Sequence, residues 1–159
     1  MLNIDIICVG GLKEQYWRDA CNEYCKRLTP WVKLRIVEIS EERSANASES
    51  MIKAVLEAEG ERILAALPEQ AFAIALCIEG TKLTSEKLAA KISEIMLSGR
   101  SSVEFIIGGS HGLSKPVKNR AQLCFSMSDL TFPHQLARVM LLEQIYRAMS
   151  INMGGKYHK

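Results

Sequence analysis

The sequence predicts an α/β fold built on one parallel sheet. Short apolar segments alternate along the chain with segments whose apolar residues recur at helical spacing, an order typical of parallel α/β proteins. The segment Ala71–Ile78 is almost continuously apolar, as strands covered on both faces are. The length of 159 residues fits one domain, and neither an internal repeat nor a linker divides the chain. We therefore expect residues 1–159 to form a single domain.

The composition excludes several classes of protein. Hydrophobic residues make up 48% of the chain and charged residues 24%, which rules out disorder as the main state. No apolar run approaches the roughly 20 residues that a membrane-spanning helix needs, and the N-terminus lacks the basic start of a signal peptide. The net charge is +2, from 20 Lys and Arg against 18 Asp and Glu. Any contact with nucleic acid must therefore come from a local patch.

The five cysteines indicate a reducing compartment. An odd number of cysteines without a secretory signal is typical of free thiols in a cytoplasmic protein. Cys21 and Cys25 share a helix face but supply at most half of a zinc site, and the three histidines are scattered. We expect neither a metal ion nor a membrane as a partner.

Three strands are expected in the first half of the chain. A β-branched apolar run predicts the first, alternation of apolar and charged residues predicts a half-exposed second, and continuous apolarity predicts the third. Two segments with helical spacing connect them, and each is followed by a proline where a stop is expected. The strands are expected at Asn3–Val9, Val32–Ile39 and Ala71–Ile78, the helices at Lys13–Leu28 and Met51–Leu67, and a polar loop at Ser40–Glu49.

The second half continues the alternation. Ser85 is expected to begin and cap a helix that Gly99 terminates. Pro133 suits the first position of the last helix, because its missing N–H is not needed there. Two strands are expected at Val103–Ile107 and Gln122–Ser126, and the last helix from about His134 to Ser150.

The last helix is apolar on two sides, with Arg138 on a mostly apolar face. One side can meet the sheet, but the other needs a second surface, which predicts a homodimer. A buried arginine is costly unless it pairs or binds a ligand, which makes Arg138 a candidate functional residue. The two apolar stripes consist of Ala137, Leu141, Ile145 and Ala148, and of Leu136, Val139, Met140 and Tyr146.

Ligands on parallel sheets usually lie outside the carboxyl ends of the strands. Three of the four expected ends carry glycine, and Gly108–Gly112 places three glycines directly after a strand, so that backbone N–H groups can approach a ligand closely. The spacing matches neither the dinucleotide fingerprint nor a phosphate-binding P-loop, so an ordinary tight turn stays open as the alternative. The four ends are Gly10-Gly11, Glu79-Gly80, Gly108–Gly112 and Met127–Phe132.

The C-terminal tail is the other unusual feature. Gly154-Gly155 supplies a hinge, and two lysines, a stacking ring and a titratable ring follow within four residues. The lysines can meet phosphate, Tyr157 can stack on a base and His158 can move a proton. A frayed terminus is the alternative.

Together these motifs resemble the bacterial ribosomal RNA large-subunit methyltransferase H family, within the SPOUT superfamily. The most specific part is Thr131-Phe132-Pro133-His134-Gln135 combined with the terminal Tyr157-His158-Lys159. The resemblance spans essentially the whole chain. Its other segments are Val9-Gly10, Lys13, Tyr16-Trp17, Tyr24, Lys26–Leu28, Phe105–Gly112, Ser126–Leu130 and Arg138–Ala148.

The resemblance implies both a reaction and a fold. The reaction is the S-adenosyl-L-methionine-dependent methylation of N3 of a pseudouridine in 23S rRNA, on the assembled ribosome. The fold is the SPOUT methyltransferase fold with a deep trefoil knot in the C-terminal half, which pattern reasoning would not propose because knots are nearly absent from proteins. Matched position by position, the cofactor-binding residues are Leu76, Gly108, Met127, Ser128, Asp129, Leu130, Thr131 and Phe132.

The chemistry gives the remaining residues their expected roles. The N3–H of pseudouridine is a weak acid, so a positioned base assists the attack on the methyl group, typically by about 10²–10⁴-fold. His158 is the expected base and Tyr157 is expected to position the target. Arg138 and Arg147 are expected to hold phosphate, with Lys159 adding charge. In a dimer, each tail can serve its own pocket or that of its partner.

Two other classes of function stay open from the sequence. One is a non-enzymatic ribosome-binding or assembly factor with the same fold, and the other is a flavodoxin-like protein that binds a small cofactor. Binding of S-adenosyl-L-methionine separates the methyltransferase from both.

Overall fold

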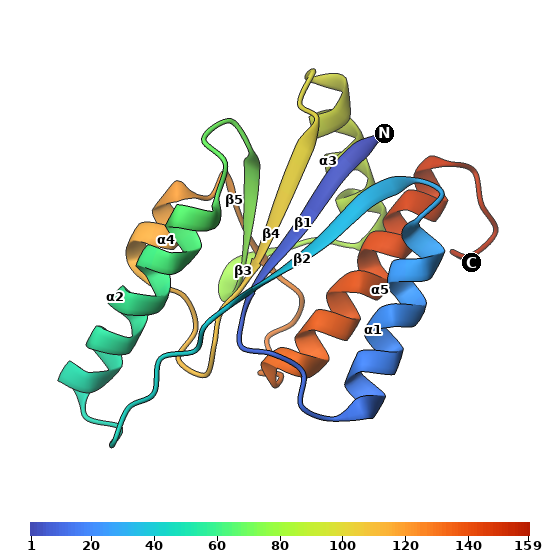
Figure 1. Ribbon diagram of the computed structural model, residues 1–159. Helices are drawn as coiled ribbons and strands as arrows, with labels where there is room; N and C mark the ends of the chain where they lie inside the picture. Colours follow the sequence, from blue (N-terminus) through green and yellow to red (C-terminus); the bar gives the residue numbers. More distant parts are fainter.

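Five parallel strands form one sheet in the order β2-β1-β4-β3-β5 (Figure 1). The computed structural model describes residues 1–159. Its strands are β1 (Leu2–Val9), β2 (Val32–Ile39), β3 (Phe72–Lys82), β4 (Ser102–Ile107) and β5 (Leu123–Ser126). Its helices are α1 (Gln15–Leu28), α2 (Glu49–Ala66), α3 (Ser85–Leu97), α4 (Lys115–Arg120) and α5 (His134–Asn152).

The helices form two layers around this sheet. Helix α5 packs between α1 and α3 on one face, over the larger apolar core, and α2 packs against α4 on the other face, over the smaller core. The predicted α/β class with a parallel sheet is confirmed. The threading of the chain through a knot stays a prediction. No helix combines the length and apolar character needed to cross a membrane.

Strand β3 differs most from the sequence prediction. It was expected to end at Glu79-Gly80 but continues to Lys82, because Leu76 and Thr81 both pair with Phe125 and the residues between them bulge out of the ladder. A Cβ on Gly80 would lie 2.7 Å from the backbone carbonyl of Cys124, so glycine is required there. The polar residues of the bulge look like a strand end in the sequence.

Three smaller differences concern helix boundaries. The six-residue helix α4 was not predicted. Thr84, not Ser85, caps α3, and its hydroxyl accepts a hydrogen bond from the Lys87 N–H. Pro133 precedes the first turn of α5 instead of occupying its first position. The positive φ of Gly99, +83°, fits its predicted role as a terminator after α3.

Most of the second apolar side of α5 is covered by the chain itself. The ring of Tyr146 stacks on Trp31 with centroids 5.4 Å apart, and Val139 packs against the larger core. The expectation that this whole side lacks a surface within the chain was wrong, because α1 and α3 flank α5. All four residues of this side are half-buried, but only Leu136 and Met140 pack against neither core.

A pair of acidic side chains is buried within the sheet. Asp5 of β1 and Glu104 of β4 lie opposite each other in register, and Arg35 of β2 pairs with Asp5. Glu104 is only 1% exposed, and its Oε2 atom has no hydrogen-bond partner. Burial and the neighbouring Asp5 carboxylate together raise the pKa of Glu104 to about 7.

This raised pKa predicts that the free energy of unfolding falls as the pH rises from about 4.5 to 7. In that window the folded protein holds the Glu104 proton, whereas the unfolded chain, with a pKa of 4.5, has lost it. Glu104→Gln removes the ionised form and should raise the free energy of unfolding at pH 8 by about 2 kcal/mol. Urea unfolding of both proteins at pH 5 and pH 8 tests this. A variant no more stable than the wild type at pH 8 would contradict it.

Candidate active site

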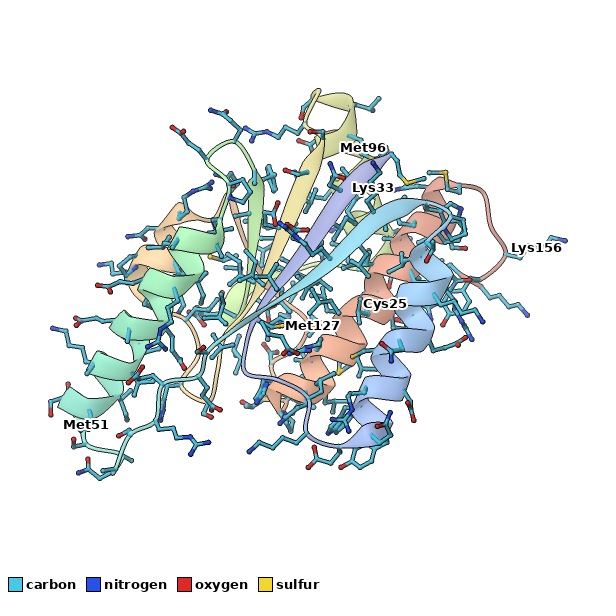
Figure 2. All side chains as sticks on the ribbon, in the orientation of Figure 1. Cys25, Lys33, Met51, Met96, Met127 and Lys156 are labelled. Carbon is cyan, nitrogen blue, oxygen red and sulfur yellow. The ribbon has the colours of Figure 1, made fainter.

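A cavity of about 880 Å³ lies at the carboxyl ends of β3, β4 and β5. Its walls are the end of β3, the glycine turn after β4, the segment that follows β5, and the start of α5. Figure 2 labels Met127 close to these strand ends and to α5. Seven of the eight positions proposed for the cofactor line this one cavity: Leu76, Gly108, Met127, Ser128, Leu130, Thr131 and Phe132.

Asp129, the eighth position, does not line the cavity. Its carboxylate forms an ion pair with Lys82 at 2.7 Å, and its side chain is 76% exposed. The pair joins the loop after β5 to the last residue of β3. Asp129 therefore contributes to the rim, where it orients the loop instead of facing the interior of the cavity.

The glycine turn is tight for reasons internal to the chain. A Cβ on Gly108 would lie 2.5 Å from the carbonyl oxygen of Gly112, and Gly112 itself has a φ of +81°. The N–H of Gly112 donates to the Gly109 carbonyl at 3.0 Å and closes the turn. Both the binding interpretation and the ordinary-turn interpretation fit this geometry, since the turn needs its glycines and also lines the cavity.

Serine hydroxyls shape the loop between β5 and α5. The Ser126 hydroxyl donates to the Ser128 carbonyl at 3.0 Å, and the Leu130 N–H donates to the Ser128 hydroxyl at 3.0 Å. Leu130 is 69% exposed although it is apolar and lines the cavity. An exposed leucine on a fixed loop gives the mouth of the cavity an apolar edge.

Arg138 was predicted to contact the substrate, and the structure places it elsewhere. Its side chain is 2% exposed. Nη1 donates to Glu38 Oε1 at 2.8 Å and Nη2 donates to the Gly10 carbonyl at 2.9 Å. The guanidinium therefore cannot meet a phosphate, and we correct the prediction: Arg138 is a positioning residue that ties α5 to the ends of β1 and β2.

This tie brings His134 to the site. Gly10 has a φ of +83°, and a Cβ there would lie 3.1 Å from the His134 ring. Burial lowers the pKa of His134, which favours the neutral ring, and His134 lines the cavity. Sequence reasoning did not assign His134 to the site, although the resemblance included it. The available signal was its place directly after Met127–Phe132 and Pro133, next to the positions assigned to the cofactor.

Glu79, which lies in the bulge of β3 and not at its end, also lines the cavity. Its carboxylate forms an ion pair with Lys118, and this hydrogen bond lowers the pKa of Glu79. The Glu79 side chain is 61% exposed. An ionised, solvated carboxylate with a lowered pKa is poorly suited to act as a general base.

The C-terminal tail packs against its own chain at a distance from the cavity. The Tyr157 hydroxyl donates to Glu143 Oε1 at 3.1 Å, and burial and this hydrogen bond raise the pKa of Tyr157 to about 12. His158 lies between Arg147, 3.3 Å from Nδ1, and Glu86, 2.8 Å from Nε2. These partners make Nε2 the donor and leave Nδ1 as an acceptor. The tail therefore has defined contacts, unlike a frayed end.

The geometry separates His158 from the cavity of its own chain. Helix α5 begins at the cavity and rises by about 1.5 Å per residue, so Arg147 lies about 20 Å along the helix from His134. In Figure 1 the C-terminus lies beside the far half of α5, away from the strand ends. Lys156 extends away from the body of the protein in Figure 2 and is exposed.

The Arg138 tie predicts a large loss of stability when its carboxylate is removed. Glu38→Ala leaves a buried guanidinium with only a carbonyl partner, which should lower the free energy of unfolding by about 2 kcal/mol. Glu23→Ala is the matched control, because Glu23 pairs with Arg27 on the surface and should cost less than about 1 kcal/mol. Chemical denaturation measures both values. Equal losses for the two variants would contradict the assigned role of Arg138.

The fold and the cavity together define a class of enzyme. The family model described as "Predicted SPOUT methyltransferase" matches residues 2–158. A solved structure, "The structure of a probable methylase family protein from Haemophilus influenzae Rd KW20", has a similar fold, with a TM-score of 0.55 and 12% identity over 98% of this chain and 70% of that one. The class is that of the SPOUT methyltransferases.

Relatives with closely similar sequences narrow the class. The chain is 52% identical to the "Ribosomal RNA large subunit methyltransferase H" of Bifidobacterium animalis subsp. lactis (strain AD011), and 51% identical to the protein of the same name from Clostridium novyi (strain NT). Each match covers 99% of this chain and 100% of the relative. The chain therefore belongs to the ribosomal RNA large subunit methyltransferase H family of SPOUT methyltransferases. Its membership favours an enzyme over the non-enzymatic factor and the flavodoxin-like protein.

Proposed function

We propose that the protein transfers a methyl group from S-adenosyl-L-methionine to N3 of a pseudouridine in the 23S rRNA of the large ribosomal subunit, on assembled ribosomes. The observation that carries the proposal is sequence identity. Along the whole chain, about half of all residues are identical to those of proteins named as ribosomal RNA large subunit methyltransferases.

The cavity supports S-adenosyl-L-methionine as the cofactor. Its volume of about 880 Å³ lies within the range of small-molecule sites, and apolar side chains alternate around it with backbone and hydroxyl groups. Leu76, Leu130 and Phe132 can enclose a flat ring, while the glycine turn and the Ser128 hydroxyl offer polar contacts. Among the side chains of the structure, no group of three or more His, Cys, Asp or Glu could hold a metal ion.

Residues of the protein have the other roles in the reaction. When bound, the cofactor supplies a methyl group on a positively charged sulfur. The loop after β5 and the glycine turn orient that group and exclude water, which lowers the barrier by alignment. His158 Nδ1 accepts the N3 proton of the base, Tyr157 positions the base through its ring and hydroxyl, and Lys159 and Arg147 add positive charge near the rRNA.

The distance between tail and cavity supports a homodimer with shared sites. Leu136 and Met140 leave apolar surface on α5 next to the cavity end of that helix. If two α5 helices pack antiparallel through this surface, the tail of each chain lies near the cavity of the other. Within its own chain, His158 would have to leave both Glu86 and Arg147 and cross much of the length of α5.

A ribosomal substrate also fits the remaining observations. The net charge of +2 is small for a protein that binds naked RNA by charge alone, whereas a folded particle offers contacts of other kinds. All five cysteines are free thiols, which supports a cytoplasmic location, where ribosomes are found. If S-adenosyl-L-methionine does not bind to the protein, a non-enzymatic assembly factor becomes the better interpretation.

Cofactor binding gives the first test of the proposal. Gly108→Val places a branched side chain against the Gly112 carbonyl, deforms the turn and should weaken binding of S-adenosyl-L-methionine more than tenfold, or by about 1.4 kcal/mol. Isothermal titration measures the affinity, with the exposed Ala90→Val as the control that should bind like the wild type. A folded Gly108→Val protein with unchanged affinity would place the cofactor elsewhere.

Deletion of Tyr157–Lys159 gives the second test. The truncated protein should bind S-adenosyl-L-methionine nearly as the wild type does, because none of these residues lines the cavity, and should fail to methylate ribosomes. Mixing truncated chains with Gly108→Val chains should restore about a quarter of the wild-type activity, because half of the dimers then hold one intact cavity and one intact partner tail.

Two results would count against this account of the tail. Full activity of the truncated protein on ribosomes would remove the tail from the reaction. An inactive mixture, with heterodimers demonstrated by mass, would mean that each tail serves its own chain.

A further inference from the structure

A second cavity, of about 590 Å³, adjoins the first one behind the glycine turn. The two cavities share Ser110 and His111 at the tip of that turn. The other walls of the second cavity come from α2, from the polar loop before it and from Lys13 in the segment after β1. A molecule that enters between the loop and the turn therefore comes next to the proposed cofactor position.

A buried carboxylate lines this second cavity. Glu59 of α2 is 3% exposed, and its Oε2 atom accepts a hydrogen bond from the Glu42 N–H at 3.0 Å. Its Oε1 atom has no partner in the protein. A buried polar atom without a partner costs about 1–3 kcal/mol, and such atoms in native proteins usually mark a binding site for a ligand or a water, or a catalytic role.

The surroundings of Glu59 leave Oε1 buried without a partner and raise the pKa of the carboxyl group. A Cβ on Gly109 would lie 3.2 Å from Oε1, so a side chain there would crowd the oxygen. Burial raises the pKa of Glu59 and the charge of Glu41 adds to the rise, whereas the Glu42 N–H, Arg62 and His111 oppose it. A buried carboxyl oxygen without a partner can accept a hydrogen bond, so the matching ligand group is an N–H or O–H donor.

The proposed substrate presents such a donor at this place. In pseudouridine, N1–H and N3–H flank the same carbonyl group on neighbouring edges of the ring. A base whose N3 faces the methyl donor in the first cavity can turn its N1–H edge toward the adjoining space. Uridine has a carbon there and offers no hydrogen bond, so an acceptor at this point distinguishes the two bases.

Resting on the proposed function, we propose that the second cavity receives the target base and that Glu59 Oε1 accepts its N1–H, which makes Glu59 the residue that selects pseudouridine over uridine. Lys13 and Arg43 line the same cavity, are exposed and form no ion pair within the chain. Glu41 and Glu42 also line this cavity, so only the two cationic side chains, and not the cavity as a whole, suit the phosphates that flank a base turned out of the RNA.

Initial rates of methylation test this proposal on two kinds of ribosome, purified from bacteria with and without the synthase that makes the target pseudouridine. The wild type should methylate the pseudouridine-containing ribosomes faster by on the order of 100-fold or more, because a polar site rejects a base that leaves it unpaired. Glu59→Gln keeps the shape but turns one acceptor into an NH₂ group. Its rate on pseudouridine should fall at least tenfold, with the affinity for S-adenosyl-L-methionine unchanged within twofold.

Glu57→Gln, the same change at an exposed position on α2, is the control and should keep the wild-type rate. A Glu59→Gln protein with more than half of the wild-type rate on pseudouridine would overturn the proposal. So would a wild-type protein that methylates both kinds of ribosome equally, a result that does not depend on the variant being folded. Both results leave the proposed function standing, whereas a wild-type protein that methylates neither ribosome would overturn that function first.

Discussion

The buried guanidinium of Arg138 connects the parts of the molecule on which the site depends. It joins α5 to the end of β2 through Glu38 and to the end of β1 through the Gly10 carbonyl. A buried arginine is costly to desolvate, and here only its Nε atom lacks a partner. Because α5 carries the cavity wall at one end and supports the tail beyond its middle, this contact determines where both lie.

The position of α5 also explains why the two halves of the proposed chemistry lie apart. The cavity proposed for the cofactor lies at the N-terminal end of α5, whereas Tyr157 and His158 contact Glu143, Arg147 and the start of α3. A helix cannot bend to bring these regions together within one chain. Two chains packed antiparallel can bring them together, and the half-buried Leu136 and Met140 offer a place for that contact.

Local patterns in the sequence predicted most of the helices and strands but did not predict the contacts between residues far apart in the chain. Periodicity predicted the five strands within a few residues, apart from β3, whose bulge depends on pairing with β5. The motif resemblance gathered positions that do line one cavity, with Asp129 at its rim. Arg138 was given a substrate role because its partner Glu38 is 100 residues away, and no local pattern shows such a pair. Glu59 was missed although helical spacing gave a signal: it lies four residues from both Val55 and Ile63, on the buried face of α2.

The most direct test of the central claim is the identity of the methylated nucleoside. Assembled ribosomes that lack the modification are incubated with the protein and S-adenosyl-L-methionine, and the 23S rRNA is digested to nucleosides for mass spectrometry. The account predicts a single new product, pseudouridine carrying one methyl group on N3. A methyl group on another nucleoside or another ring atom, or no product from ribosomes under conditions where the cofactor binds, would contradict it.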